Sequence, residues 1–222
     1  MISSKPADIF LIAGGPQAKN TKEILAEVLA GCKKKAPSVA YIGTASGDNR
    51  VFFLMLKPII MAAGFGKVTL VPLVRRFDPD KARDILLASD VIFISGGDVD
   101  MGMKYLRKRN LVSFLREIYD GGKLFCGVSA GAIMLCRNWM FWRDPDDDNT
   151  AELLDCLGFA PLLCDVHAEE DSWVEMKRLL GFFRQGATGY GIPAGGALRV
   201  APNGRIKTIG AAPIRFIKKS ET

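Results

Sequence analysis

The stretch of the chain best suited to chemistry is KLFCGVSAGAIML, Lys123 to Leu135. Residues 127–131 read Gly-Val-Ser-Ala-Gly and satisfy the pattern G-x-S-x-G. Between a strand and a helix, this pattern forms a sharp, strained turn that lifts the serine hydroxyl above the sheet. We therefore expect Ser129 to be a nucleophile. The amide of Ala130, at the start of the next helix, would face the same space and stabilise developing negative charge.

A serine hydroxyl is a weak nucleophile until a base takes its proton. The sequence contains one histidine, His167, so the base is fixed if this is a Ser–His enzyme. His167 follows an apolar run and is therefore expected at a strand end. The pair Gly96–Gly97 follows another apolar run, and the Gly97 amide could be a second donor to an oxyanion. Gly96 and Asp98 are candidate substrate-binding neighbours, although a plain turn would explain the glycine pair equally well.

Short apolar runs alternate with helical patterns through the first 135 residues, which predicts a parallel-rich sheet with helices on both faces. In such a sheet, sites form at the carboxyl ends of the strands, where the glycine pairs and Ser129 lie. Beyond Asp155 the pattern becomes β-like and predicts hairpins, with a tight turn at the PNGR segment, residues 202–205. No linker interrupts the chain, so we expect one α/β domain over residues 1–222. The expected strands lie within residues 8–15, 38–46, 67–74, 90–98 and 123–129, and the expected helices within 20–35, 51–63, 78–89 and 101–119.

Composition narrows the class of protein. The 222 residues carry a net charge of +6, but no aromatic residues interleave with the basic clusters as a nucleic-acid stacking platform requires. The most apolar stretch is interrupted by Lys57 and Pro58, which argues against a membrane span. The five cysteines have no C-x-x-C spacing. We therefore expect a cytoplasmic protein with no metal site, no organic cofactor, no nucleic-acid partner and no membrane partner.

Taken together, these motifs resemble the dipeptidase E and cyanophycinase family of serine peptidases. The resemblance implies a class I glutamine-amidotransferase-like fold, a flavodoxin-like three-layer sandwich. It also implies that Ser129 is the nucleophile, that His167 is the base and that the amides of Gly97 and Ala130 bind the oxyanion. Asp144 lies where dipeptidase E carries an aspartate that has been proposed as catalytic. The segments that carry the resemblance are LIAGG at 11–15, FISGGD at 93–98, GVSAGA at 127–132, DVH at 165–167 and GIPAGGAL at 191–198.

The chain also departs from this family. Ala194 stands where relatives usually carry a glutamate, the expected partner for the histidine. The glycine pair is followed by DVD rather than by asparagine or glutamine, and the histidine is followed by AEEDSW rather than by basic residues. Asp165, Asp144 or an acid within residues 169–171 could replace the missing carboxylate.

Three functions follow from these patterns. The leading hypothesis is a serine peptidase that acts on small peptides, with N-terminal aspartyl or β-aspartyl peptides as the first substrates implied by the resemblance. A pseudoenzyme that binds a ligand in the same cleft is favoured by Ala194. An α/β-hydrolase esterase shares G-x-S-x-G and has the chain order Ser, acid, His, which Asp144 would satisfy. The expected partner is a small peptide, and a homodimer is left open.

Overall fold

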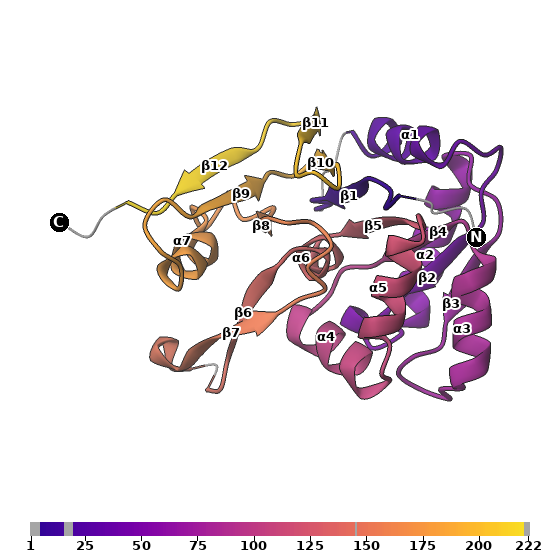
Figure 1. Cartoon of the computed structure of the whole chain (residues 1–222), viewed down its shortest axis with the longest axis horizontal. Coiled ribbons are helices and arrows are strands. Elements are labelled where there is room, and N and C mark those ends of the chain that lie inside the picture. Colours follow the sequence, from indigo (N-terminus) through magenta and orange to yellow (C-terminus); the bar gives the residue numbers. More distant parts are fainter. Residues whose placement is uncertain (1–4, 16–19, 145, 220–222) are drawn as a thin grey trace.

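A seven-stranded sheet organises the computed structural model, which describes residues 5–15, 20–144 and 146–219 (Figure 1). The strand order is β11-β10-β1-β5-β4-β2-β3. The five strands from β1 to β5 are parallel, and β10 and β11 add an antiparallel edge. The strands are β1 Ile9–Ile12, β2 Val39–Ile42, β3 Val68–Val71, β4 Val91–Ile94, β5 Leu124–Val128, β10 Gly196–Val200 and β11 Ile206–Gly210.

Helices cover both faces of this sheet, so apolar side chains are buried on both sides of each central strand. In β1, Ile9 and Leu11 join one core cluster, whereas Phe10 and Ile12 join another. The cluster around Phe10 lies under α1, Thr21–Cys32, and α2, Arg50–Ala62. The predicted α/β fold class is confirmed. The helices of the opposite face are α3 Pro79–Ala88, α4 Val99–Lys108, α5 Val112–Asp120 and α6 Ala130–Leu135.

The single helix predicted over residues 101–119 is wrong, because the chain forms two helices there. The helix α4 ends at Lys108 and α5 begins at Val112. Asn110 between them has φ +54°, a left-handed conformation that asparagine tolerates better than most residues. This break lets α4 and α5 lie at different angles on the sheet (Figure 1).

A second group of strands lies beyond α6. The strands β8, Leu163–Val166, and β9, Thr188–Ile192, are parallel, and β12, Ile214–Ile217, pairs antiparallel with β9. The helix α7, Val174–Gly181, connects β8 to β9. The hairpin predicted at residues 202–205 is confirmed between β10 and β11, whereas β9 belongs to this separate sheet.

A hairpin of β6, Asn138–Trp142, and β7, Ala151–Asp155, projects from the molecule (Figure 1). The acidic segment over residues 143–150 forms its turn, except for residue 145, which lies outside the described residues. Short 3-10 helices occur at Thr44–Ser46 (η1) and Asp148–Thr150 (η2).

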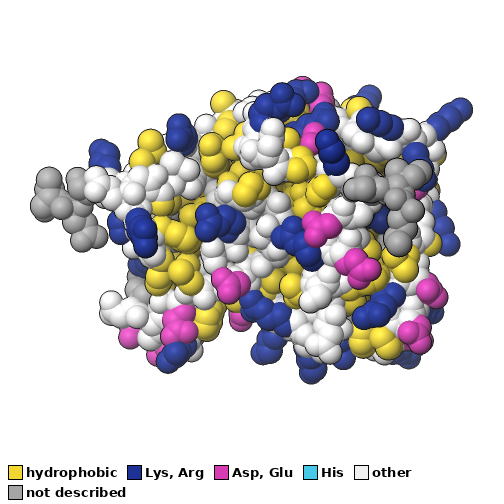
Figure 2. Space-filling model, in the orientation of Figure 1, with side chains coloured by type: hydrophobic (Ala, Val, Ile, Leu, Met, Phe, Trp, Pro, Cys, Tyr) yellow, Lys and Arg dark blue, Asp and Glu magenta, His cyan; other side chains and the backbone are white. Residues whose placement is uncertain are grey.

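Charged side chains are dispersed over the surface. In Figure 2, lysine and arginine side chains are spread among acidic and hydrophobic ones rather than gathered in one patch on the visible face. Within the part of the chain that the structure describes, no helix has the length and apolar character needed to cross a membrane.

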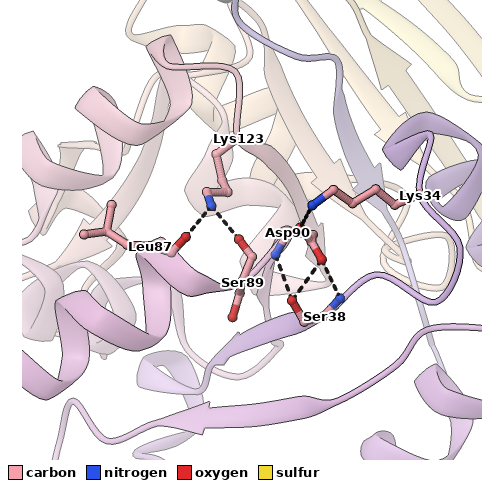
Figure 3. Close-up of polar contacts among 6 residues, drawn as sticks. All are labelled: Lys34, Ser38, Leu87, Ser89, Asp90 and Lys123. Carbon is pink, nitrogen blue, oxygen red and sulfur yellow. Dashed lines mark hydrogen bonds and ion pairs between the residues drawn. The ribbon is translucent and has the colours of Figure 1, made fainter.

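A polar network ties together the amino ends of three parallel strands, opposite the edge that carries Ser129 (Figure 3). Asp90, just before β4, accepts hydrogen bonds from the amide and hydroxyl of Ser38, just before β2, at 2.9 and 3.0 Å. It also pairs with Lys34. Lys123, just before β5, donates to the carbonyls of Leu87 and Ser89. These bonds help fix the stagger of the strands from the base of the sheet.

We expect Asp90→Ala to lower the free energy of unfolding at pH 7 by about 1–2 kcal/mol, because the Ser38 amide loses its acceptor. The bond to Lys34 lowers the pKa of Asp90 below its ordinary value of 3.8. The stabilisation is therefore fully present above pH 3.8 and is lost as the pH falls through the lowered pKa. Urea denaturation at pH 7 measures the effect, with the exposed Asp84→Ala on α3 as control. Equal losses in both variants would contradict this role.

Candidate active site

Ser129 occupies the turn between β5 and α6, with φ +54° and ψ −125°. This backbone conformation is strained for a residue with a side chain and is typical of a nucleophile elbow. The neighbouring backbone is too close for larger residues. A Cβ atom on Gly127 would lie 2.2 Å from the carbonyl oxygen of Gly131, and one on Gly131 would lie 2.1 Å from the carbonyl oxygen of Ile94. The G-x-S-x-G pattern is therefore a requirement of this turn.

The structure brings His167 to Ser129. The Oγ atom of Ser129 lies 2.8 Å from Nε2 of His167, a hydrogen-bond distance. His167 follows β8, has φ +43°, and donates its backbone N–H to the carbonyl of Ile192 at 2.9 Å. The nucleophile and the candidate base thus come from the ends of strands in two different sheets.

The two amides expected to hold an oxyanion lie beside the serine. Gly97, Ala130 and Ser129 line the same cavity. A Cβ atom on Gly96 would lie 3.0 Å from the Cβ of Ser129, so the glycine pair packs directly against the nucleophile. Within the described residues, neither the Gly97 amide nor the Ala130 amide donates to another backbone group. Both N–H groups are therefore available to a substrate carbonyl.

The other two predicted site residues are placed differently. Asp98 lines the cavity, but its Oδ1 atom also caps α4 by accepting from the amide of Met101. Asp144 lies in the turn of the β6–β7 hairpin, where its Oδ1 accepts from the amide of Asp146 and its backbone bonds to Thr150. The structure does not bring Asp144 to the cavity that holds Ser129 and His167.

No carboxylate of the described residues accepts a hydrogen bond from Nδ1 of His167. However, Glu169 places its Oε1 atom 2.6 Å from the backbone nitrogen of Ala194, which donates to it. A Cβ atom on Gly15 would lie 3.2 Å from the Cβ of Ala194 and 3.6 Å from that of His167, so the latter two residues are close neighbours. A carboxylate from the segment after the histidine thus lies next to Ala194, the position at which the resemblance leads us to expect a glutamate.

A cavity of about 670 Å³ opens beside Ser129 and His167. Aromatic side chains of β6 and acidic side chains from several elements line it. The contributions of β6, of α7 and of Asp100 in α4 were not predicted from the sequence, because they depend on how distant segments pack. The missed residues are Trp139, Phe141, Trp142, Asp100, Glu175 and Arg178.

Asp165 in β8 is the most deeply buried acid of this cavity, with 3% of its surface exposed. Its Oδ1 accepts from the amide of Val166 at 2.8 Å, whereas no described group meets hydrogen-bond geometry with Oδ2. Burial, reinforced by the nearby acids Glu175 and Asp171, raises the pKa of Asp165 from 3.8 to about 7. The amides of Val166 and Met176 partly oppose this shift. Asp165 is therefore poised between its protonated and ionised forms at neutral pH.

The described residues include no group of three or more His, Cys, Asp or Glu side chains arranged to hold a metal ion. Their five cysteines are free thiols, and burial raises the pKa of those for which a shift is resolved. Thiolate chemistry at these positions is thereby disfavoured.

Comparisons with known proteins agree with the fold. The model of peptidase family S51 matches residues 9–208. The crystal structure of a peptidase from an acI-B1 actinobacterium superposes with a TM-score of 0.75 at 18% identity, covering 98% of this chain and 92% of that chain. The structure of a protein described as peptidase E from Listeria monocytogenes EGD-e gives a TM-score of 0.70 at 17% identity, covering 93% and 100%. No curated protein matches the chain.

We expect Asp165→Asn to change how stability depends on pH. Wild-type Asp165 holds its proton in the folded state up to about pH 7, whereas the unfolded chain releases it near 3.8. Folding stability therefore falls as the pH rises between these values, and asparagine removes this fall. From pH 5 to pH 8, the difference in unfolding free energy should move in favour of the variant by roughly 2–3 kcal/mol. Urea denaturation at both pH values measures it, and parallel stability profiles for the two proteins would contradict the raised pKa.

Proposed function

Because the chain belongs to peptidase family S51, we propose that it is a serine peptidase that hydrolyses small peptides through Ser129 and His167. The observation that carries the proposal is the 2.8 Å contact between Ser129 Oγ and His167 Nε2. A nucleophile within hydrogen-bond reach of a base is the minimum arrangement for acyl transfer. The strained turn at Ser129 supports the same function, since it exposes the hydroxyl at the sheet edge.

The proposed reaction begins with Nε2 of His167 unprotonated and its ring proton on Nδ1. His167 accepts the hydroxyl proton of Ser129 as Oγ attacks the scissile carbonyl carbon. The carbonyl oxygen becomes negatively charged and accepts hydrogen bonds from the amides of Gly97 and Ala130. The helix α6 has only six residues, so these individual N–H groups matter more than its macrodipole.

The tetrahedral intermediate then collapses. His167 gives the proton to the leaving amine, the C–N bond breaks, and an ester joins the acyl group to Ser129. A water molecule, deprotonated by the same imidazole, attacks this ester, and the acid product leaves with Ser129 regenerated. The cavity of about 670 Å³ is within the usual range for small-molecule sites and suits a short peptide. N-terminal aspartyl and β-aspartyl peptides are the substrates that the resemblance suggests.

We assign the positioning of His167 to Glu169. Its carboxylate is held at the backbone of Ala194, which neighbours the histidine. From there, Glu169 would hold the segment that carries His167 against the chain that follows β9. Asp144 does not serve this role, because its side chain and its backbone carbonyl accept hydrogen bonds from Asp146 and Thr150 within the hairpin turn.

A pseudoenzyme that binds a peptide without cleaving it is the second candidate. The observation that favours it is the absence of a carboxylate bonded to Nδ1 of His167 among the described residues. Binding without turnover would separate it from the peptidase.

We expect Ser129→Ala and His167→Ala each to reduce peptide cleavage to the background rate, because the two side chains act as one unit. Cleavage of a panel of short peptides, followed by mass spectrometry, measures this effect. The double variant should lose no more activity than either single variant. Equal cleavage by wild type and Ser129→Ala would rule out this mechanism, and binding without cleavage by wild type would favour the pseudoenzyme.

We expect Glu169→Gln to lower kcat more than tenfold but less than the ~10⁴-fold loss seen when a directly bonded triad carboxylate is replaced. KM should change little, and Glu169→Asp should restore part of the activity. The matched control is Glu170→Gln, which changes an exposed neighbour. Steady-state kinetics across pH separate a role in positioning His167 from a purely structural role of Glu169, because a purely structural role would leave the pH profile unchanged. A kcat for Glu169→Gln equal to that of the control would remove Glu169 from the mechanism.

A further inference from the structure

The cavity beside Ser129 has an excess of negative charge. Four of the residues that line it carry carboxylates: Asp98 and Asp100 at the start of α4, Asp165 in β8 and Glu175 in α7. Arg178 is the only lysine or arginine among the lining residues. The chain as a whole has a net charge of +6, so this local excess runs against its overall charge.

Arg178 does not cancel this excess. It lies three residues after Glu175 on α7, and its positive charge partly lowers the pKa of that carboxyl. Burial and the charge of Asp171 nevertheless raise the pKa of Glu175 overall. A carboxyl group whose ionisation is penalised in this way would gain from a further positive charge beside it.

Asp165 gives the cavity a buried carboxyl group whose hydrogen bonding is incomplete: Oδ1 accepts from the amide of Val166, and the amide of Met176 also favours the ionised form. Asp165 is 3% exposed, and its Oδ2 atom has no hydrogen-bond partner among the described residues. Leaving a buried acceptor unpaired is costly, and native structures pair most such groups. The residue lines the same cavity as Ser129 and His167, so a negative charge on it acts on a ligand bound there.

The part of the cavity lining that β6 supplies is suited to an alkyl chain. Trp139, Phe141 and Trp142 of β6 present aromatic surface there. The Nε1 atom of Trp142 is buried and has no acceptor among the residues that the structure describes, so it is a second unpaired polar group in a side chain of this lining. Aromatic surface accommodates the methylene stem of a long basic side chain and attracts its charged end.

We propose that this cavity selects peptides that carry a positively charged nitrogen next to the cleaved bond, bound by Asp165 and Glu175. The proposal rests on the proposed peptidase function and names its substrate class. The nitrogen could belong to a lysine or arginine side chain on the acyl side of the bond, or to a free N-terminus. An aspartyl side chain in the same place would be disfavoured, because a third carboxylate would lose water beside two others.

The test uses the Ser129→Ala protein, which binds substrate without cleaving it, and isothermal titration calorimetry at pH 7.5. The ligands are lysyl-leucine, norleucyl-leucine and aspartyl-leucine, with the N-acetylated form of each. Norleucine has the lysine stem without the charge. We expect lysyl-leucine to bind at least tenfold more tightly than norleucyl-leucine, and aspartyl-leucine to bind most weakly. If the N-terminus supplies the charge, acetylation rather than the norleucine change will cause the loss.

Variants of the two cavity acids test which side chains bind the positively charged nitrogen of the peptide. Asp165→Asn and Glu175→Gln, each combined with Ser129→Ala, should remove most of the preference for the charged peptide. Glu170→Gln, which lies outside the cavity, should leave it intact. Either cavity variant suffices if the other fails to fold. Equal affinity for charged and neutral peptides, tighter binding of aspartyl-leucine, or no binding of any dipeptide at millimolar concentration would overturn the proposal.

The binding result is independent of turnover. If lysyl-leucine binds as expected but wild-type protein leaves it intact, the substrate class stands and the peptidase function fails. If wild type cleaves aspartyl-leucine rather than lysyl-leucine, the function stands and the charge preference fails.

Discussion

The close approach of backbone segments around Ser129 is the constraint on which the rest of the site depends. β5 must turn into α6 at one residue, and α6 must pass within contact of the end of β4. Gly127 and Gly131 make this possible, since a Cβ atom at either would overlap a carbonyl oxygen. The turn forces Ser129 into a strained conformation with φ +54°, and the packed sheet holds that strain. The exposed hydroxyl and the free amide of Ala130 are consequences of the same turn.

The second half of the site depends on how two sheets meet. Ser129 ends a strand of the seven-stranded sheet, and His167 ends a strand of the three-stranded sheet. α6 packs between them: Cys136 at its end contacts Cys164 of β8, with 3.2 Å between the sulfur atoms. On the other side, the chain that leaves β1 reaches the segment after β9, where Gly15 lies against Ala194. The distance between nucleophile and base is therefore set by core packing rather than by a flexible loop.

The sequence alone was enough for the features that depend on local pattern. The elbow around Ser129 and the hairpin at residues 202–205 each follow from residue types within a few positions. The break at Asn110 was missed because helical periodicity continues across it, although asparagine is a residue that adopts positive φ. The acidic cavity could not be predicted from the sequence, because Asp165 and Glu175 are brought together by the packing of α7 on β8. Glu169 was visible in the sequence, but its contact with Ala194 joins segments 25 residues apart.

We propose above all that Ser129 is a nucleophile activated by His167. The most direct test is mass-spectrometric mapping of the protein after incubation with an alkyl fluorophosphonate, which forms a stable ester with an activated serine. We expect one adduct, on Ser129, that forms much more slowly in His167→Ala and is absent in Ser129→Ala. An unmodified Ser129, or an adduct that forms equally fast without His167, would contradict this proposal.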